Sequence, residues 1–283
     1  MSPGTISIIL ADSITHVPEQ PRIPRIVICG SHGGLSSGIF ALKKGVQGVI
    51  FNDAGGGKDQ AGIAGLALLE KNGIYAATVD AFTAKIGIAE ETQGGAISFV
   101  NTLSKKVGIQ AGMSARKAAE IMQNAPVLIL KVPSESTEEY EEQLTVIHTS
   151  PTGYRIVAMD SNSQVTPENR KDIILTGSHG ALVGSAPVVK YPVIAAFYND
   201  AGIGKNQAGI SRLPRLQDAG IIGATVDAHT ARIGVGLETY QSGIISHVNG
   251  LAKDLRIAKG MRAFDAAWRI LQEKEEHYSP SGK

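Results

Sequence analysis

The most regular feature of the chain is a series of short apolar runs, each ending at a glycine or beside a polar residue. "RIVICG" (25–30), "VQGVIF" (46–51) and "IYAATV" (74–79) are rich in β-branched residues and show no polar face. Runs of this length and composition are typical of strands that are buried on both faces. The second half of the chain repeats the series as "DIILTG" (172–177), "PVIAAFY" (192–198) and "IIGATV" (221–226).

Between these runs the apolar residues take a helical period. In "AGIAGLALLEKNG" (61–73), Ile63, Leu66 and Leu69 lie on one helical face, and Gly73 is a stop signal after the helix. Alternating strands and helices predict parallel strands joined by right-handed crossovers. We therefore expect an α/β fold built of Rossmann-like three-layer units with parallel strands.

Two long segments of the chain are nearly the same. "FNDAGGGKDQAGI" (51–63) returns as "YNDAGIGKNQAGI" (198–210), and "GIYAATVDAFTAKIG" (73–87) returns as "GIIGATVDAHTARIG" (220–234). Copies this long, and only two of them, do not fit a solenoid. They predict a tandem duplication of one domain-sized unit, with the two halves related by a pseudo-twofold axis as in an isologous dimer.

The repeats divide the chain into three parts. We expect a first α/β repeat at 1–125, connecting strands with an acidic loop at 126–152, and a second α/β repeat at 153–283. Within the connection, "VLILKV" and "LTVIHT" are strand-like, and "PSESTEEYEEQ" between them is acidic and rich in turn formers. "SPTG" (150–153) is a candidate hairpin turn before the next apolar run.

Composition narrows the classes of partner. The 283 residues carry a formal net charge of +1, and 5% of them are aromatic, so neither electrostatics nor base stacking favours nucleic acid. No run reaches the length of a membrane span, and no signal peptide is evident. Cys29 is the only cysteine, which excludes an intrachain disulfide and fits a reducing compartment. We expect a soluble, cytoplasmic homo-oligomer that acts on a small molecule.

Polar residues follow the predicted strands rather than precede them. In an open parallel sheet, the loops after the carboxyl ends of the strands converge on one edge, where ligands bind. The first repeat places there Ser31, His32, Asn52, Asp53, Lys58, Asp80 and Lys85. The second repeat places there Ser178, His179, Asn199, Asp200, Lys205, Asp227, His229 and Arg232.

Two glycine-rich motifs could hold an anion. In "GSHG" the flanking glycines allow a turn with exposed N–H groups, although a serine cap and a histidine bonded to the backbone explain it equally well. In "AGIGKNQAG", Gly202 and Gly204 precede Lys205, and the loop could cradle a phosphate or carboxylate. The P-loop spacing is absent, and a plain glycine turn with a solvated lysine is the alternative.

The sequence predicts a small-molecule enzyme, most simply a hydrolase of a carbonyl or amide in a compact polar or anionic substrate. Ser178 would be the nucleophile, Lys205 or His179 the base, and Asp200 or Asp227 the orienting carboxylate. His229 joins this catalytic set because Phe82 stands at the equivalent position of the first repeat. The substrate-binding set would be Ser31, His32, Asn52, Asp53, Lys58, Asp80, Asn199, Gly202, Gly204 and Arg232.

Several alternatives remain open at this stage. Lyase or isomerase chemistry could use the same lysine and histidine groups, and the two rims could instead hold a nucleotide, phosphate or carboxylate without turnover. The aspartates could simply cap turns and helices. Asp227, His229 and His179 could hold a metal, but their spacing does not support it, so we expect neither a metal nor a cofactor.

Overall fold

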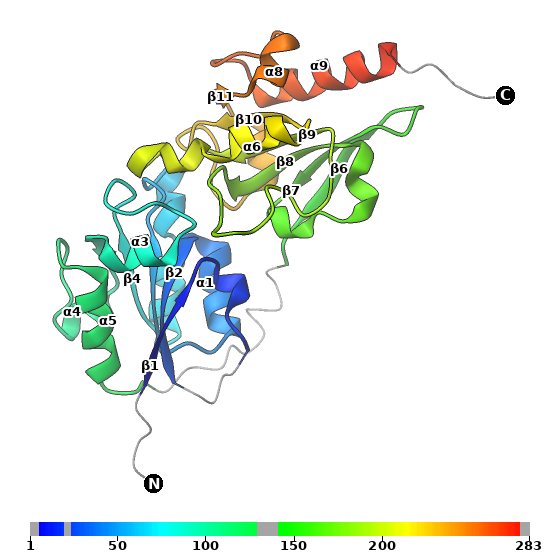
Figure 1. The fold of residues 1–283 in the computed structure, drawn as a ribbon. Helices are drawn as coiled ribbons and strands as arrows, with labels where there is room; N and C mark the ends of the chain where they lie inside the picture. Colours follow the sequence, from blue (N-terminus) through cyan, green and yellow to red (C-terminus); the bar gives the residue numbers. More distant parts are fainter. Residues whose placement is uncertain (1–5, 20–23, 129–140, 278–283) are drawn as a thin grey trace. The chain divides into compact units, whose positions relative to one another are not determined.

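A computed structural model describes residues 6–19, 24–128 and 141–277 of the chain (Figure 1). The chain divides into two compact units. Unit 1 consists of Met1–Glu141 together with two short segments, Ala181–Ala186 and Ala201–Gly209. Unit 2 consists of Glu142–Gly180, Pro187–Asp200 and Ile210–Lys283. Unit 1 therefore includes two pieces of the second half of the sequence.

Unit 1 contains a five-stranded sheet in the order β1-β2-β3-β4-β5. Its first four strands are parallel, and β5 pairs antiparallel with β4. The strands are β1 (Ser7–Ala11), β2 (Arg25–His32), β3 (Gly48–Asn52), β4 (Tyr75–Val79) and β5 (Ile97–Val100). The helices are α1 (Leu35–Lys43), α2 (Gly65–Lys71), α3 (Ala89–Gly94), α4 (Thr102–Lys106) and α5 (Ala115–Asn124), with short 3-10 helices η1 (Ile14–His16) and η2 (Lys58–Ile63).

Both faces of the unit 1 sheet are covered, because successive residues of a strand point to opposite faces. Val27 and Cys29 of β2 pack in a core cluster with residues of α1 and α2, whereas Ile26 and Ile28 pack in a second cluster with α5. All four side chains are fully buried. The unit is thus three-layered, and Cys29 is an ordinary core residue.

Unit 2 contains a six-stranded sheet in the order β11-β10-β9-β8-β7-β6. The four inner strands are parallel, and both edge strands pair antiparallel with their neighbours. The strands are β6 (Leu144–Thr149), β7 (Arg155–Met159), β8 (Asp172–His179), β9 (Ala195–Asn199), β10 (Ile222–Val226) and β11 (Ile245–Val248). The helices are α6 (Arg212–Asp218), α7 (Gly236–Gln241), α8 (Gly250–Asp254) and α9 (Ala263–Glu276), with 3-10 helices η3 (Asn162–Gln164) and η4 (Pro167–Lys171).

The hairpin predicted at 150–153 is confirmed. Ser150 N donates to the carbonyl of Tyr154 at 2.8 Å, and β6 and β7 pair antiparallel on either side of the turn. The strand prediction for 127–132 and the acidic-loop prediction for 133–143 fall largely on residues 129–140, outside the described residues.

The α/β prediction is correct, but two details of it are wrong. The sheets are mixed rather than wholly parallel, because β5 and β11 turn back along the sheet edge instead of following a crossover. In addition, residues 180–194 between β8 and β9 form no helix, although α1 occupies the corresponding connection in unit 1. Pro187 and Pro192 lie in this stretch, and proline interrupts helical hydrogen bonding. The pseudo-twofold duplication and the three domain boundaries stay predictions.

No helix in the described part of the chain has the length and apolar character needed to cross a membrane.

Candidate functional site

Asn52 ties together the loops that follow β3 and β4 of unit 1. It is the last residue of β3 and is completely buried. Its Nδ2 donates to the carbonyl of Ala84 at 3.0 Å, and its Oδ1 accepts from the N–H of Ala54 at 2.9 Å. The side chain therefore satisfies backbone hydrogen-bonding groups on both loops and holds the two loops in place at this edge of the sheet.

Two predicted aspartates make the same kind of backbone contact. Asp53 Oδ1 accepts from Gly55 N at 2.9 Å and from Ala81 N at 3.0 Å. Burial raises the pKa of Asp53, and these hydrogen bonds oppose the rise. Asp80 Oδ1 accepts from the N–H of Phe82 at 2.7 Å. These contacts are those of the turn-capping alternative, so both side chains have a structural role.

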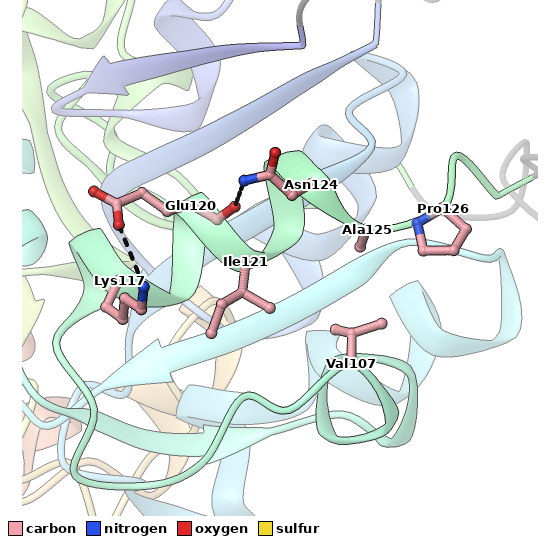
Figure 2. A pocket seen from close by; sticks show the side chains of 7 residues that line it. All are labelled: Val107, Lys117, Glu120, Ile121, Asn124, Ala125 and Pro126. Atoms are coloured by element: carbon pink, nitrogen blue, oxygen red, sulfur yellow. Dashed lines mark hydrogen bonds and ion pairs between the residues drawn. The ribbon is translucent and has the colours of Figure 1, made fainter.

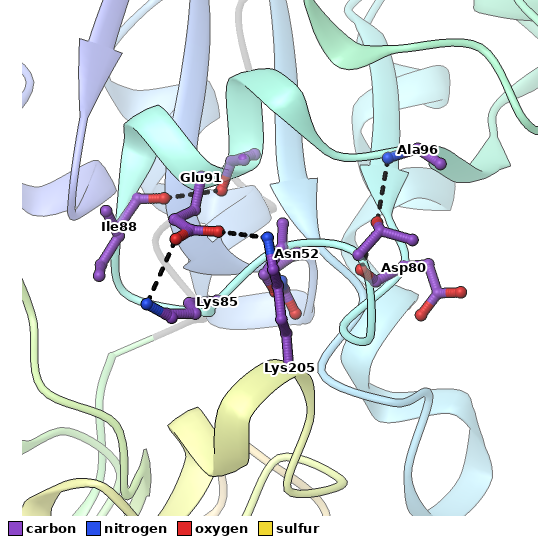
Figure 3. Close-up of polar contacts among 10 residues, drawn as sticks. Asn52, Asp80, Lys85, Ile88, Glu91, Ala96 and Lys205 are labelled. Carbon is purple, nitrogen blue, oxygen red and sulfur yellow. Dashed lines mark hydrogen bonds and ion pairs between the residues drawn. The ribbon is translucent and has the colours of Figure 1, made fainter.

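Three charged side chains meet at this edge of unit 1, and we call Lys85, Glu91 and Lys205 the lysine–glutamate cluster (Figure 3). Lys205 Nζ donates to Glu91 Oε2 at 2.7 Å, and Lys85 Nζ lies 3.3 Å from Glu91 Oε1. The hydrogen bond from Lys205 is the main cause of a lowered pKa for Glu91. One carboxylate is thus shared by two ammonium groups, and the cluster keeps one positive charge.

The side chains of the cluster are only partly buried. Lys205 is 38% exposed, Lys85 is 33% exposed and Glu91 is 26% exposed. The carboxylate of Asp80 points away from the cluster in Figure 3, so it does not offset the positive charge locally. The two ammonium groups are therefore accessible to a ligand from solvent.

Lys205 reaches the cluster because residues 201–209 belong to unit 1. It begins the 3-10 helix η5 (Lys205–Ile210), and its backbone N–H donates to the carbonyl of Ala81 at 2.8 Å. The preceding loop approaches the glycine loop after β3 very closely. A Cβ atom built on Gly55 would lie 3.1 Å from Gly202 Cα, and both glycines have φ of +68°.

The glycine loops thus have a structural explanation. Gly204 has φ of +64°, and a Cβ there would lie 2.9 Å from the carbonyl oxygen of Ala81. Left-handed backbone and contact between two backbones both require residues without a side chain. The near-identical thirteen-residue segments provide the two loops that touch.

Ser31 and His32 end β2 and are both 8% exposed. Ser31 Oγ accepts from the N–H of Ile14 at 3.1 Å, and His32 Nδ1 accepts from the N–H of Gly34 at 3.1 Å. Burial lowers the pKa of His32 to about 4, so the ring is neutral near pH 7 with its proton on Nε2. The Nδ1 lone pair is engaged, which leaves this histidine no free basic nitrogen.

The predicted residues of unit 2 make equivalent backbone contacts. Ser178 Oγ accepts from Asn162 N at 2.9 Å, and Asp200 Oδ1 accepts from Ala228 N at 3.0 Å. Asn199 Nδ2 donates to the carbonyl of Ala231 at 2.9 Å, and Asp227 Oδ1 accepts from His229 N at 2.8 Å. His229 itself is exposed.

Arg232 binds a glutamate that the sequence analysis missed. Its Nε donates to Glu238 Oε1 at 2.5 Å, and its backbone N–H donates to Glu238 Oε2 at 3.1 Å. Neither Glu238 nor Glu91 directly follows a strand, so the position of the predicted strands did not point to them. Each glutamate precedes a threonine and lies six residues after Lys85 or Arg232, and that recurrence could have revealed both pairs.

The residues of the predicted site are divided between the two units. In unit 1, Lys205 N donates to the carbonyl of Ala81, the residue after Asp80, and Ala81 N donates to Asp53 Oδ1, so Lys205 lies on the same loops as these two aspartates. The predicted nucleophile Ser178 belongs to unit 2, as do His179, Asp200, Asp227 and His229, whereas the predicted base Lys205 belongs to unit 1. Lys58 begins η2 in unit 1 and is half-buried.

Among residues 6–19, 24–128 and 141–277, no three side chains of His, Cys, Asp or Glu are grouped as a metal site would require. Asp227, His229 and His179 are not grouped in this way.

Two pockets lie away from these residues. One, of about 560 Å³, is in unit 1 beside α5 and is lined by Val107, Lys117, Glu120, Ile121, Asn124, Ala125 and Pro126 (Figure 2). The other, of about 410 Å³, is in unit 2 and is lined by Val193, Ile194, Gly220, Ile222, Leu251, Asp254, Leu255, Glu273, Lys274 and His277. Neither pocket includes a residue of the predicted site.

Comparison of the chain with protein-family models, with curated proteins and with solved structures finds no match.

Proposed function

We propose that the protein binds a compact anionic small molecule at the carboxyl edge of the unit 1 sheet, on the ammonium groups of Lys85 and Lys205. The observation that carries the proposal is the shared carboxylate of Glu91, which leaves one positive charge between two partly exposed lysines. This edge is where open α/β sheets take their ligands. The chemistry favours a carboxylate or phosphate.

The surrounding contacts support a preformed site. Asn52 and Asp53 hold the loops after β3 and β4 through backbone groups, and Lys205 N bonds the carbonyl of Ala81. Lysines on loops held in this way need little reorganisation when a ligand arrives, which reduces the free-energy cost of binding. An anion would compete with Glu91 for the two ammonium groups.

Binding without turnover is the alternative that these contacts favour among those left open by the sequence. Hydrolysis of a carbonyl compound stays a prediction, as does lyase or isomerase chemistry. Ser178 Oγ already accepts a backbone hydrogen bond, and Ser31 does the same. These two hydroxyls serve as caps, so neither serine supplies an observation in favour of acyl transfer.

The test is calorimetric titration of the full-length protein with inorganic phosphate and with acetate. The variants Lys85→Gln and Lys205→Gln each remove one charge of the cluster, and Lys71→Gln removes one exposed charge at the end of α2. We expect each cluster variant to weaken binding of the better anion by at least about tenfold, since a charge-assisted hydrogen bond contributes about 1.5–3 kcal/mol. Lys71→Gln should leave the affinity unchanged.

The proposal is wrong if neither anion binds the wild-type protein. It is also wrong if Lys71→Gln weakens binding as much as the cluster variants do, since the effect would then report only net charge.

A further inference from the structure

The pocket of unit 2 lies at the amino ends of the parallel strands, which is the edge opposite to that of the polar loops. Ile194 directly precedes β9, and Ile222 is the first residue of β10. The volume of about 410 Å³ is within the range of small-molecule sites. This pocket is independent of the lysine–glutamate cluster and of the function proposed for it.

The floor of the pocket is apolar. Val193, Ile194 and Ile222 come from the ends of the strands, and Leu251 and Leu255 come from α8 and the residue after it. Val193 and Ile222 are buried, and the other three side chains are partly exposed. Such a surface favours a hydrocarbon body over a fully polar ligand, because burying apolar area is favourable.

The mouth of the pocket carries an excess of negative charge. Asp254 and Glu273 supply two carboxylates, and Lys274 supplies one ammonium group. His277 Nε2 lies 2.9 Å from Glu273 Oε1, so this imidazole already faces a carboxylate. The two carboxylates outnumber the single ammonium group of Lys274.

Helix ends add to this negative potential. Residues that line the pocket lie at or just beyond the carboxyl ends of three helices: Gly220 after α6, Asp254 at the end of α8, and His277 after α9. The last carbonyl groups of a helix have no partner within the helix and carry partial negative charge. At α6 and α8 such carbonyls accept from the residues that follow, as Gln217 O does from Gly220 N and Lys253 O does from Arg256 N, so they contribute partial negative charge rather than free acceptors.

We propose that this pocket binds a small amphipathic amine, with its apolar body on the aliphatic floor and its ammonium group beside Asp254 and Glu273. The ammonium donates hydrogen bonds to these carboxylates, and the partial negative charge of the helix ends attracts it. An anionic or purely polar ligand gains neither interaction.

The unit 1 pocket provides a matched control (Figure 2). It also lies beside a long helix, but its charged residues, Lys117 and Glu120, form an ion pair at 3.9 Å and balance each other. Val107 follows α4 in that pocket as Leu255 follows α8 in unit 2. Val107→Trp therefore reproduces in unit 1 the steric change made in unit 2, and Glu120→Gln removes the one carboxylate of this pocket.

The experiment titrates the full-length protein with hexylamine, hexanol and hexanoate, and measures each dissociation constant by calorimetry. We expect hexylamine to bind at least about tenfold more tightly than hexanol, and hexanoate to bind most weakly. Leu255→Trp, which fills the pocket, should abolish hexylamine binding. The double variant Asp254→Asn/Glu273→Gln should reduce the preference for the amine over the alcohol to within about twofold. Val107→Trp and Glu120→Gln should change neither the affinity for hexylamine nor the preference for the amine over the alcohol.

Equal affinity for hexylamine and hexanol, tighter binding of hexanoate, or no binding of hexylamine would overturn the proposal. An equal loss of binding in Val107→Trp would place the ligand elsewhere and also overturn it. If Leu255→Trp fails to fold, as judged by circular dichroism, the double variant decides the matter. Asp254 is exposed, and the side chain of Glu273 is partly exposed, at 39%, so neither replacement alters the buried core.

Discussion

Replacing Gly55 by alanine tests whether the repeated glycine loops are needed because two backbones touch. Gly55 has φ of +68°, and its new Cβ would lie 3.1 Å from Gly202 Cα. Left-handed backbone costs alanine about 1 kcal/mol relative to glycine. The contact with a backbone atom adds an overpacking cost of about 1–3 kcal/mol. We therefore expect Gly55→Ala to lower the free energy of unfolding by about 2–4 kcal/mol.

Gly108 is the matched control for this substitution. It also has positive φ, at +95°, but a Cβ added there would meet no atom within 4 Å. Gly108→Ala should cost only the backbone term of about 1 kcal/mol. Urea denaturation followed by far-ultraviolet circular dichroism gives both values, provided that the slope with denaturant concentration is unchanged.

A second comparison asks whether the two loops act through one contact. Gly202→Ala creates the same clash from the other side, since its Cβ would lie 3.1 Å from Gly55 Cα. The loops need to separate only once, so the double variant should lose less stability than the sum of the single variants. The reasoning fails if Gly55→Ala is no more destabilising than Gly108→Ala, or if the two loop variants are additive.

Three further predictions concern charged groups. Lys205 lowers the pKa of Glu91, so this pair stabilises the fold at pH values above the unfolded pKa of Glu91, and the stabilisation is lost as the pH falls through the folded pKa. Glu91→Gln should therefore lower the free energy of unfolding by about 0.5–1 kcal/mol near neutral pH and leave it unchanged in strong acid. Urea midpoints measured across pH test this. His32 has a pKa lowered to about 4, so it should remain neutral in nuclear magnetic resonance titrations until about pH 4. Its protonation should account for up to about 3 kcal/mol of the stability lost as the pH falls from about 6.5 to 4. Titration near the ordinary pKa of histidine would contradict this. Arg155 binds the fully buried carboxylate of Asp172 at 2.8 and 2.7 Å, and Asn169 Nδ2 also donates to this carboxylate at 2.6 Å. Because Asn169 stays in place, Arg155→Met should cost about 1.5–3 kcal/mol in chemical denaturation, as expected for hydrogen bonds to a charged group. A loss under about 1 kcal/mol would show that the carboxylate does not need the guanidinium.

The inner strands could be predicted because their signal is local. Runs such as 25–30 and 172–177 are continuous, apolar and β-branched, and their burial follows from composition alone. The edge strands β5 and β11 gave no such signal, since each has only four residues and mixes buried positions with partly or fully exposed ones. The stretch at 180–194 contains two prolines, which were a usable warning against a helix.

The site was harder to predict than the fold. Strand order was enough to place Asn52, Asp53 and Asp80 at one edge of unit 1. It could not show that Lys205 would join them, because the assignment of residues 201–209 to unit 1 arises from long-range contacts. Side-chain pairing, such as that of Glu91 with two lysines, depends on the same contacts and leaves only a weak trace in sequence.

The composition of unit 1 has a consequence for synthesis of the protein. Two of its pieces, 181–186 and 201–209, are encoded after much of unit 2. Domains usually begin to fold on the ribosome in order from the amino terminus. A nascent chain that has emerged from the ribosome only as far as residue 141 still lacks the segment 201–209, which carries Lys205. The first-made unit therefore reaches its complete form late in translation, after residue 209 has emerged from the exit tunnel.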